Sequence, residues 1–171
     1  MYAEALKQVQ AAKASAKLKR DSRFWRGWEK FVSWITFGKN PNTNQWLTTT
    51  MGKTIWLCDG FDSLDPRTKA DTLIHELEHV RQYAKMTIPG FLFVYIFVFL
   101  PVGLAYGRYW LEREAYAKGY KIQLEGLSGG IRATAANWLA DEFAAHMAGG
   151  VYGWAWPFKR RAKSWMVAKL T

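Results

Sequence analysis

Three features that often narrow the class of a protein are scarce or missing in this sequence: cysteine, an apolar leader and internal repeats. Cys58 is the sole cysteine among 171 residues, so no disulfide can form within the chain, and folding in a reducing compartment is expected. We interpret Cys58 as a small packed residue and not as a nucleophile. No apolar run precedes Phe24, which argues against a cleaved signal peptide and predicts synthesis for the cytoplasm.

Low-complexity tracts are also absent, and so is any nucleic-acid-binding motif of defined spacing. The formal net charge is +10, but charge alone is weak evidence, so the sequence does not favour a nucleic-acid partner. A chain of this length can bury a core without disulfides. One compact domain with extensions at both ends is therefore sufficient to account for it.

Histidine is scarce as well, with three in the chain, yet two of them stand in one motif. Residues 75–79 read His75-Glu76-Leu77-Glu78-His79, the H-E-x-x-H pattern of zinc hydrolases. Two histidines four residues apart project from the same face of a helix, so both imidazoles can reach one metal ion. The glutamate beside the first histidine can hold a metal-bound water. The pattern therefore predicts a zinc site of the peptidase type.

The residues around the motif predict a helix from about 66 to 85. Asp65 can cap the free amides, Pro66 suits the first helical position, and neither Pro nor Gly recurs until Pro89. At 100° per residue the apolar side chains form one stripe and the histidines face away from it. The predicted stripe contains Ala70, Leu73, Leu77, Val80 and Ala84, and the opposite side contains Asp71, His75, Glu78, His79 and Gln82.

A catalytic zinc usually has three protein ligands, so a third has to be sought downstream. A predicted helix around residues 109–118 contains Glu112 and Glu114, which lie on roughly opposite faces because they are two positions apart. Glu112 shares its side with small and aromatic residues suited to helix packing, whereas Glu114 lies nearer lysines, where an exposed ion pair is expected. We favour Glu112 as the ligand, with Glu114 as the alternative.

His75-Glu76-x-x-His79 followed by Glu112-x-x-Ala115 resembles the gluzincin metallopeptidases, whose third zinc ligand is a glutamate on a later helix. In the branch with integral-membrane members an aspartate that orients a ligand histidine follows the alanine, and here that position is Tyr116. The residues before the motif, 48–57, and Trp154-x-Trp156-Pro157 are similar to small zincin-like proteins of bacteria and bacteriophages. The resemblance covers about residues 46–158.

The resemblance implies metal-assisted hydrolysis of a peptide or protein substrate. Zinc would lower the pKa of its bound water and polarise a carbonyl, while Glu76 takes and returns the proton. A donor to the developing oxyanion is also expected, and the candidates are Tyr109, Tyr116, Tyr120 and His146. His146 has an alternative explanation, since it ends a predicted helix from 131 to 148 and suits the helix dipole.

Residues 48–57 alternate Thr and Ile around a Met-Gly pair, which predicts strand structure with a bend. Zincins commonly present an edge strand to the substrate backbone. By that analogy this segment would bind an extended peptide by strand addition.

An uncharged stretch separates the two parts of the proposed site. Residues 91–100 are wholly apolar, but Pro89-Gly90 and Pro101-Val102-Gly103 limit the run. A single membrane crossing would also separate His79 from Glu112 by about 30 Å, which is incompatible with one zinc. Segment 88–107 is therefore expected to be a buried helix, a re-entrant or surface-dipping hairpin, or a surface that packs against other subunits.

Positive charge is concentrated at both ends of the chain and is interleaved with aromatic residues. Such helices suit an anionic membrane surface or a larger protein assembly; the alternative is two solvated helix faces with their aromatics folded onto the core. The N-terminal set is Lys13, Lys17, Lys19, Arg20, Arg23 and Arg26 with Phe24, Trp25, Trp28, Phe31 and Trp34. The C-terminal set is Lys159, Arg160, Arg161, Lys163 and Lys169 with Trp154, Trp156, Phe158 and Trp165.

The predicted fold is mainly α with a small β-sheet. We divide the chain into a basic N-terminal helical extension (1–40, with a helix from about 3 to 37), a zincin-like domain (41–150, including 88–107) and a Trp-rich basic C-terminal tail (151–171). The leading hypothesis is a zinc metallopeptidase that has His75, His79 and Glu112 as ligands and Glu76 as the catalytic base and that acts at a membrane or envelope surface. The alternative is a structural or assembly protein, for example a virion component, that retains a zincin fold.

Overall fold

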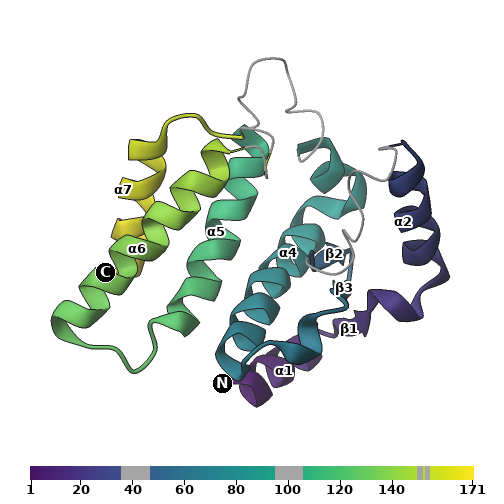
Figure 1. Ribbon diagram of the computed structural model, residues 1–171, viewed down its shortest axis with the longest axis horizontal. Helices are drawn as coiled ribbons and strands as arrows, with labels where there is room; N and C mark the ends of the chain where they lie inside the picture. The colour runs from purple at the N-terminus through teal and green to yellow at the C-terminus, as the bar shows by residue number, and fades with distance from the viewer. Residues whose placement is uncertain (36–46, 95–105, 150–151, 153–154) are drawn as a thin grey trace. The chain divides into compact units, whose positions relative to one another are not determined.

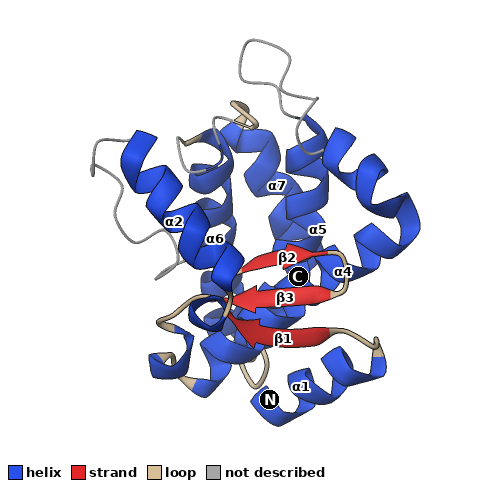
Figure 2. Ribbon diagram, turned by 90° about the vertical axis from the view of Figure 1, so that its right-hand side faces the viewer, coloured by secondary structure: helices blue, strands red, loops and turns tan. Residues whose placement is uncertain are grey.

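The computed structural model describes residues 1–35, 47–94, 106–149, 152 and 155–171. The chain forms two compact units, Met1–Val80 and Arg81–Thr171, and each is described by itself. Helices predominate in both, and the strands form one small sheet, as Figure 2 shows. The predicted fold class, mainly α with a small β-sheet, is therefore confirmed.

The first unit combines a three-stranded sheet with helices (Figure 1). The strand order is β1-β3-β2, with β1 parallel to β3 and β2 antiparallel to it. The elements are α1 (Tyr2–Ala11), β1 (Ser15–Leu18), the 3-10 helix η1 (Lys19–Asp21), α2 (Arg23–Ile35), β2 (Thr49–Met51), β3 (Thr54–Leu57), the 3-10 helix η2 (Phe61–Ser63) and the first part of α4 (Pro66–Leu92).

The prediction of one helix from about 3 to 37 is wrong. The chain leaves α1 through Lys13, which has φ 53°, and then forms β1, which pairs with β3. Ser22 is extended and its carbonyl accepts a hydrogen bond from the Arg26 amide, so α2 starts afresh after it. The helical propensity of 13–18 is overridden by sheet pairing with a partner far along the chain, whereas Ser22 is a local start signal that the sequence does contain.

The strand structure predicted for 48–57 is present as a hairpin. Met51 pairs with Thr54, so Gly52 and Lys53 form a two-residue connection. Gly52 has φ 60°, a conformation that glycine adopts without the steric cost of a Cβ atom. The predicted bend at the Met-Gly pair is therefore the turn of this hairpin.

Helix α4 begins as predicted, with Asp65 as its cap. The Asp65 carboxylate accepts hydrogen bonds from the Arg67 amide (2.9 Å) and the Thr68 amide (3.1 Å). A hydrogen bond from the Thr68 hydroxyl, followed by those from the two amides, holds the pKa of that carboxyl below its usual value. The helix is regular up to residue 86, close to the predicted end at 85. Thr87 has φ 60° and ψ 163°, and Pro89, which lacks an amide proton, follows it.

Most of the predicted apolar stripe of α4 is buried. Ala70, Leu73 and Leu77 have no exposed surface and Val80 has 4%. Ala84, which we predicted on the same stripe, is exposed. The stripe therefore forms the core of the first unit together with residues of the sheet and of η2, among them Ile55 and Phe61.

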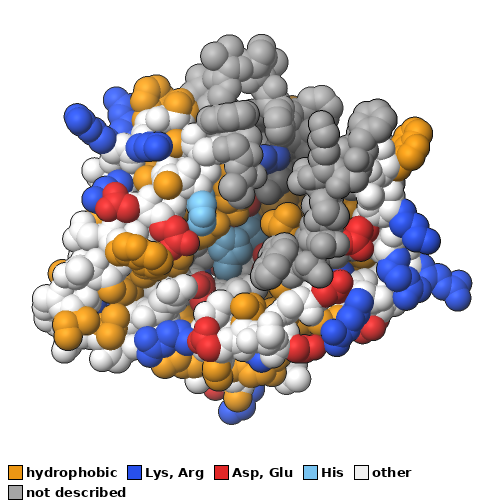
Figure 3. All heavy atoms as spheres, viewed as in Figure 1, with side chains coloured by type: hydrophobic (Ala, Val, Ile, Leu, Met, Phe, Trp, Pro, Cys, Tyr) orange, Lys and Arg blue, Asp and Glu red, His pale blue; other side chains and the backbone are white. Residues whose placement is uncertain are grey.

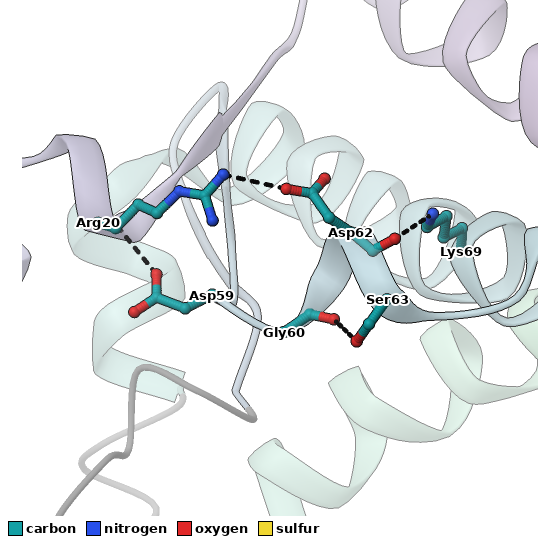
Figure 4. A network of polar contacts seen from close by, with 6 residues as sticks. All are labelled: Arg20, Asp59, Gly60, Asp62, Ser63 and Lys69. Carbon is teal, nitrogen blue, oxygen red and sulfur yellow. Dashed lines mark hydrogen bonds and ion pairs between the residues drawn. The ribbon is translucent and has the colours of Figure 1, made fainter.

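A polar network fixes the start of α4 to η1 within the first unit (Figure 4). The Arg20 guanidinium donates to the Asp62 carboxylate at 3.0 Å, and the Arg20 amide donates to Asp59 at 3.1 Å. Lys69 of α4 donates to the Asp62 carbonyl at 2.8 Å. Because both charged side chains of the ion pair are about half exposed or more, we expect the network to orient the loop more than it stabilises the fold.

In its described residues the second unit contains the end of α4 and the helices α5 (Tyr106–Gln123), α6 (Gly129–Ala148) and α7 (Lys159–Leu170). Helix α6 begins two residues before the predicted 131. Helices α6 and α7 contact each other extensively, and both contact α5. Their shared core includes Leu124, Leu139, Phe143, Met147, Met166 and Leu170, each no more than 2% exposed.

The predicted apolar segment 88–107 lies largely outside the described residues, since 95–105 belong to the part that the structure does not describe. Its first residues continue α4, where the Phe91 ring stacks on Tyr83 at 3.8 Å and packs with Leu111 of α5. Among the described residues, none of the helices combines the length and the apolar character that crossing a membrane requires.

Candidate metal centre

The two histidines of the motif lie side by side on α4 in the first unit. Their Nε2 atoms are 3.3 Å apart, and the rings meet edge to face with centroids 5.0 Å apart. His79 is buried, with 7% of its surface exposed, and His75 is half-buried. Two ligand atoms about 2.0–2.1 Å from a zinc at the tetrahedral angle are about 3.3–3.4 Å apart. The pair therefore has a spacing that suits one zinc ion, and the same spacing also suits a hydrogen bond between two neutral imidazoles.

Glu76 is held by a residue of the sheet. It is 7% exposed, and the Thr50 hydroxyl, on edge strand β2, lies 2.6 Å from its Oε2 atom. The same hydroxyl lies 3.2 Å from the Glu76 backbone carbonyl. Since a threonine hydroxyl has one proton to donate, the shorter contact to the carboxylate is the stronger hydrogen bond. The contact fixes one carboxylate oxygen and leaves Oε1 to other partners.

A buried lysine of η1 contacts the same edge strand, β2. Lys19 is 2% exposed, donates to the Thr49 hydroxyl at 2.9 Å, and has its Nζ atom 4.1 Å from the centre of the Trp25 ring. Burial lowers the pKa of Lys19 to about 8, and the negative charge of Glu76 is the largest influence in the opposite direction. A cation is therefore held in the electrostatic neighbourhood of the predicted catalytic base.

Glu112 lies on α5 in the second unit and is one of its most buried polar residues, with 3% exposed. It shares the inward side of α5 with Tyr109 and Ala115, as the helical wheel predicts. Glu114 is half-buried and its carboxylate lies 3.9 Å from the guanidinium of Arg113. Of the two candidate ligands, Glu112 is thus the one withdrawn from solvent.

The end of α4 and the middle of α5 are joined within the second unit. The Gln82 side-chain amide donates to the Leu111 carbonyl at 3.0 Å, and Tyr83 packs against the Leu111 side chain. Gln82 is itself buried. This contact fixes the turn of α5 that contains Glu112 to the turn of α4 that directly follows His79.

The four candidate oxyanion donors all belong to the second unit. Tyr109 stacks on Trp156 with centroids 4.9 Å apart, and desolvation raises its pKa. Tyr120, 4% exposed, belongs to the buried helical core. Tyr116 is half-buried with its hydroxyl 2.9 Å from the Tyr152 hydroxyl.

His146 is half-buried near the end of α6, and its ring centre is 6.2 Å from that of Tyr116. Its backbone carbonyl accepts the Gly149 amide, so it occupies the last helical turn as predicted. Cys58, the sole thiol, is 6% exposed, in agreement with its interpretation as a packed residue.

Sequence reasoning missed Thr50 and Lys19 as neighbours of Glu76. Thr50 belongs to the predicted strand, but nothing in a strand pattern specifies which helix its inward side chain meets. Lys19 lies in the helix predicted from 3 to 37, which does not form. Lysine side chains are rarely buried without a carboxylate partner, so the sequence predicts an exposed position for Lys19.

Comparisons with protein-family models, with curated proteins and with solved structures each gave no match.

Proposed function

We propose that the protein is a zinc-dependent metallopeptidase that binds zinc through His75, His79 and Glu112. The observation that carries this proposal is the 3.3 Å separation of the two histidine Nε2 atoms beside a buried Glu76. Two imidazole nitrogens and one carboxylate oxygen are a donor set that catalytic zinc accepts, with a fourth position left open. The chemistry of these residues therefore fits the metal.

The choice of Glu112 rests on the continuity of α4. His75, His79 and Gln82 follow one another at helical spacing on one face, and the helix is regular through all three. Gln82 binds the carbonyl of Leu111, the residue before Glu112. The proposal requires a carboxylate oxygen of Glu112 within about 2.0–2.2 Å of the ion that the histidines hold.

When bound, zinc would supply Lewis acidity toward a substrate carbonyl and an attacking water. Glu76 would take the proton of that water and return it to the leaving amine. We assign this role to Oε1, because Oε2 accepts the hydrogen bond of Thr50. Tyr116 is the tyrosine we favour as donor to the developing oxyanion, because it is half-buried whereas Tyr109 and Tyr120 are buried in the helical core.

Elemental analysis of the purified protein tests the ligand set. We expect one zinc per chain in the wild type, loss of zinc in His75→Ala and Glu112→Ala, and retention in the matched control Glu114→Ala. Circular dichroism verifies that each variant is folded. Loss of zinc in Glu114→Ala with retention in Glu112→Ala would identify Glu114 as the third ligand. A folded wild type without zinc would contradict the proposal.

Hydrolysis of a broad peptide library tests the chemistry separately from the binding. Glu76→Gln keeps the size of the side chain and removes its basicity, so we expect zinc to be retained and turnover to fall by about a hundredfold or more. Zinc retained in a wild-type protein that cleaves no peptide would count against a peptidase and leave a metal-binding protein.

The second candidate function is a structural or assembly role, and an exposed apolar surface on α6 favours it. Ile131 is 71% exposed and Trp138 is 63% exposed, and they line one shallow depression with Gly130, Thr134 and Ala135. A protein that uses this surface for contacts should form defined oligomers or copurify with large particles. Its function should tolerate Glu76→Gln, which the peptidase cannot.

A further inference from the structure

Helix α2 presents a surface of aromatic and basic side chains that is separate from the candidate metal centre. Phe24 is 59% exposed, Trp28 is 45% exposed and Trp34 is 76% exposed. Arg23, Arg26 and Lys30 are exposed on the same helix. Exposed large aromatics are uncommon on the surface of a soluble domain, and several on one short helix indicate an interaction site.

The helical spacing makes these residues one continuous surface. Phe24 and Trp28 are four apart and form one ridge, while Arg23, Gly27, Lys30 and Trp34 form the adjacent ridge at spacings of four, three and four. No atom lies within 4 Å of a Cβ built at Gly27, so space on the second ridge is open. We call the five side chains on these ridges, Arg23, Phe24, Trp28, Lys30 and Trp34, the α2 surface.

The fold fixes the direction in which the α2 surface points. Trp25, one residue along from Phe24, is 7% exposed and packs on Trp56 of β3 with ring centres 6.3 Å apart. The Arg26 guanidinium donates to the Arg20 carbonyl at 3.2 Å, which attaches the start of α2 to η1. The helix is therefore held by its opposite side, and its aromatic side is directed away from the unit.

We propose that the α2 surface binds an anionic lipid membrane. Aromatic side chains are favoured at the level of the lipid headgroups, and Arg and Lys attract anionic phosphates there. The α2 surface contains two cations, Arg23 and Lys30, and no acidic residue, so its charge complements that of the membrane. Figure 3 shows blue Lys and Arg side chains protruding at the right-hand edge, where Figure 1 draws α2.

The observations favour a membrane over a nucleic acid. The α2 surface has no Asn, Gln, Ser or Thr side chain that could hydrogen-bond bases. Its aromatic and cationic ridges run beside each other along a helix of 13 residues, about 20 Å in length. Such an arrangement lets the helix lie in the plane of an interface with its rings among the acyl chains and its cations among the phosphates.

Cosedimentation of the full chain with vesicles tests the proposal. We expect binding to phosphatidylcholine vesicles that contain phosphatidylserine, and much weaker binding to phosphatidylcholine alone. Each cation near an anionic surface contributes about fivefold to the affinity, so the double variant Arg23→Gln, Lys30→Gln should bind about 25-fold less tightly. Phe24→Ser with Trp28→Ser and Trp34→Ser should remove binding to both kinds of vesicle.

Two matched controls make the result specific to α2. Ile131→Ser with Trp138→Ser removes exposed apolar groups of similar size from α6, and Arg160→Gln with Arg161→Gln removes exposed cations from α7. Both control proteins should bind vesicles as the wild type does. All substituted residues are exposed, so each variant should retain the circular dichroism spectrum of the wild type.

The proposal is overturned if the wild type does not sediment with anionic vesicles, or if it does so equally well after both α2 substitutions. Retention of a nucleic acid or formation of oligomers that depend on the same five residues, without vesicle binding, would assign the α2 surface to another partner. None of these outcomes depends on zinc or on hydrolysis.

Discussion

Helix α2 and the segment around helix α7 both combine Trp with Lys and Arg, yet two Trp side chains of α2 are exposed whereas Trp156 and Trp165 are packed against the helical core. Around α7, Trp156 stacks on Tyr109, and Trp165 packs against the helical core and lies 4.7 Å from the Arg113 guanidinium. In α2, Trp25 packs inward while Trp28 and Trp34 are exposed. The sequence pattern of Trp with Lys and Arg is thus compatible with a core helix and with an interaction surface.

The difference follows from what each helix has to pack against. Helix α7 contacts two long helices, and Ala162, Met166 and Leu170, at spacings of four, are buried between them. Among the described side chains of α2, Trp25 is the buried ring, and it packs on Trp56 of the sheet. The side chains that a basic aromatic helix buries therefore depend on what it packs against and not on its composition alone.

The largest expected effect that separates the two helices is on stability. Met166→Ala in α7 removes a fully buried side chain and should lower the free energy of unfolding by about 2–5 kcal/mol. Phe24→Ala in α2 removes a larger but exposed side chain and should change it by no more than about 0.5 kcal/mol. Urea denaturation of both variants measures the difference. Comparable losses would show that α2 is also part of the core and would break the comparison.

The next effect concerns the attachment of α2 through Trp25 and Lys19. The pKa of Lys19 is about 8 in the folded protein against an ordinary 10.5, so between these values the unfolded chain binds more protons. The free energy of unfolding should therefore rise with pH in this window, by about 1.4 kcal/mol for each unit of pKa shift. Lys19→Met should remove this rise.

Denaturation at a series of pH values between about 8 and 10.5 measures the effect. Lys17→Met is the matched control, because Lys17 is exposed on β1 and should leave the slope as it is in the wild type. An equal slope in wild type and Lys19→Met would mean that Lys19 does not titrate in this window.

The smallest effect sharpens the description of α7. Its Lys163 donates to Asp141 of α6 at 2.8 Å, and both side chains are more than one-third exposed. Asp141→Asn should therefore cost only about 0.2–1 kcal/mol, less at high salt. The urea midpoint at low and high salt checks this. A loss as large as that of Met166→Ala would mean that charge, not burial, holds α7.

Local signals in the sequence were sufficient for the elements that begin and end on recognisable residues. Asp65-Pro66 marks the start of α4, Gly52 marks the hairpin turn, and the wheel around Glu112 predicts its burial. The helix expected from 3 to 37 failed because pairing of β1 with β3 joins residues whose partners are not visible locally. The contacts of Thr50 and Lys19 were unpredictable for the same reason.

In the candidate site, too, local relations could be predicted from the sequence and tertiary contacts could not. The relation of His75 to His79 follows from helical spacing alone, so the sequence predicts it fully. The relation of Glu76 to Thr50 depends on how a helix packs against a sheet, and the identity of the third ligand depends on a second helix. The metal analysis of Glu112→Ala and Glu114→Ala can therefore identify the third ligand, which the His75–His79 motif cannot do.

Parallel pairing of β1 with β3 has a consequence for the order of folding. Ser15 and Thr54, whose hydroxyls are 3.3 Å apart, are separated by 39 positions in the chain. At a synthesis rate of about 5–20 residues per second, β1 waits about 2–8 seconds before the strand it pairs with has been made. During this interval the growing chain carries a strand edge without its partner, and the sheet that supports Glu76 can close only after β3 has left the ribosome.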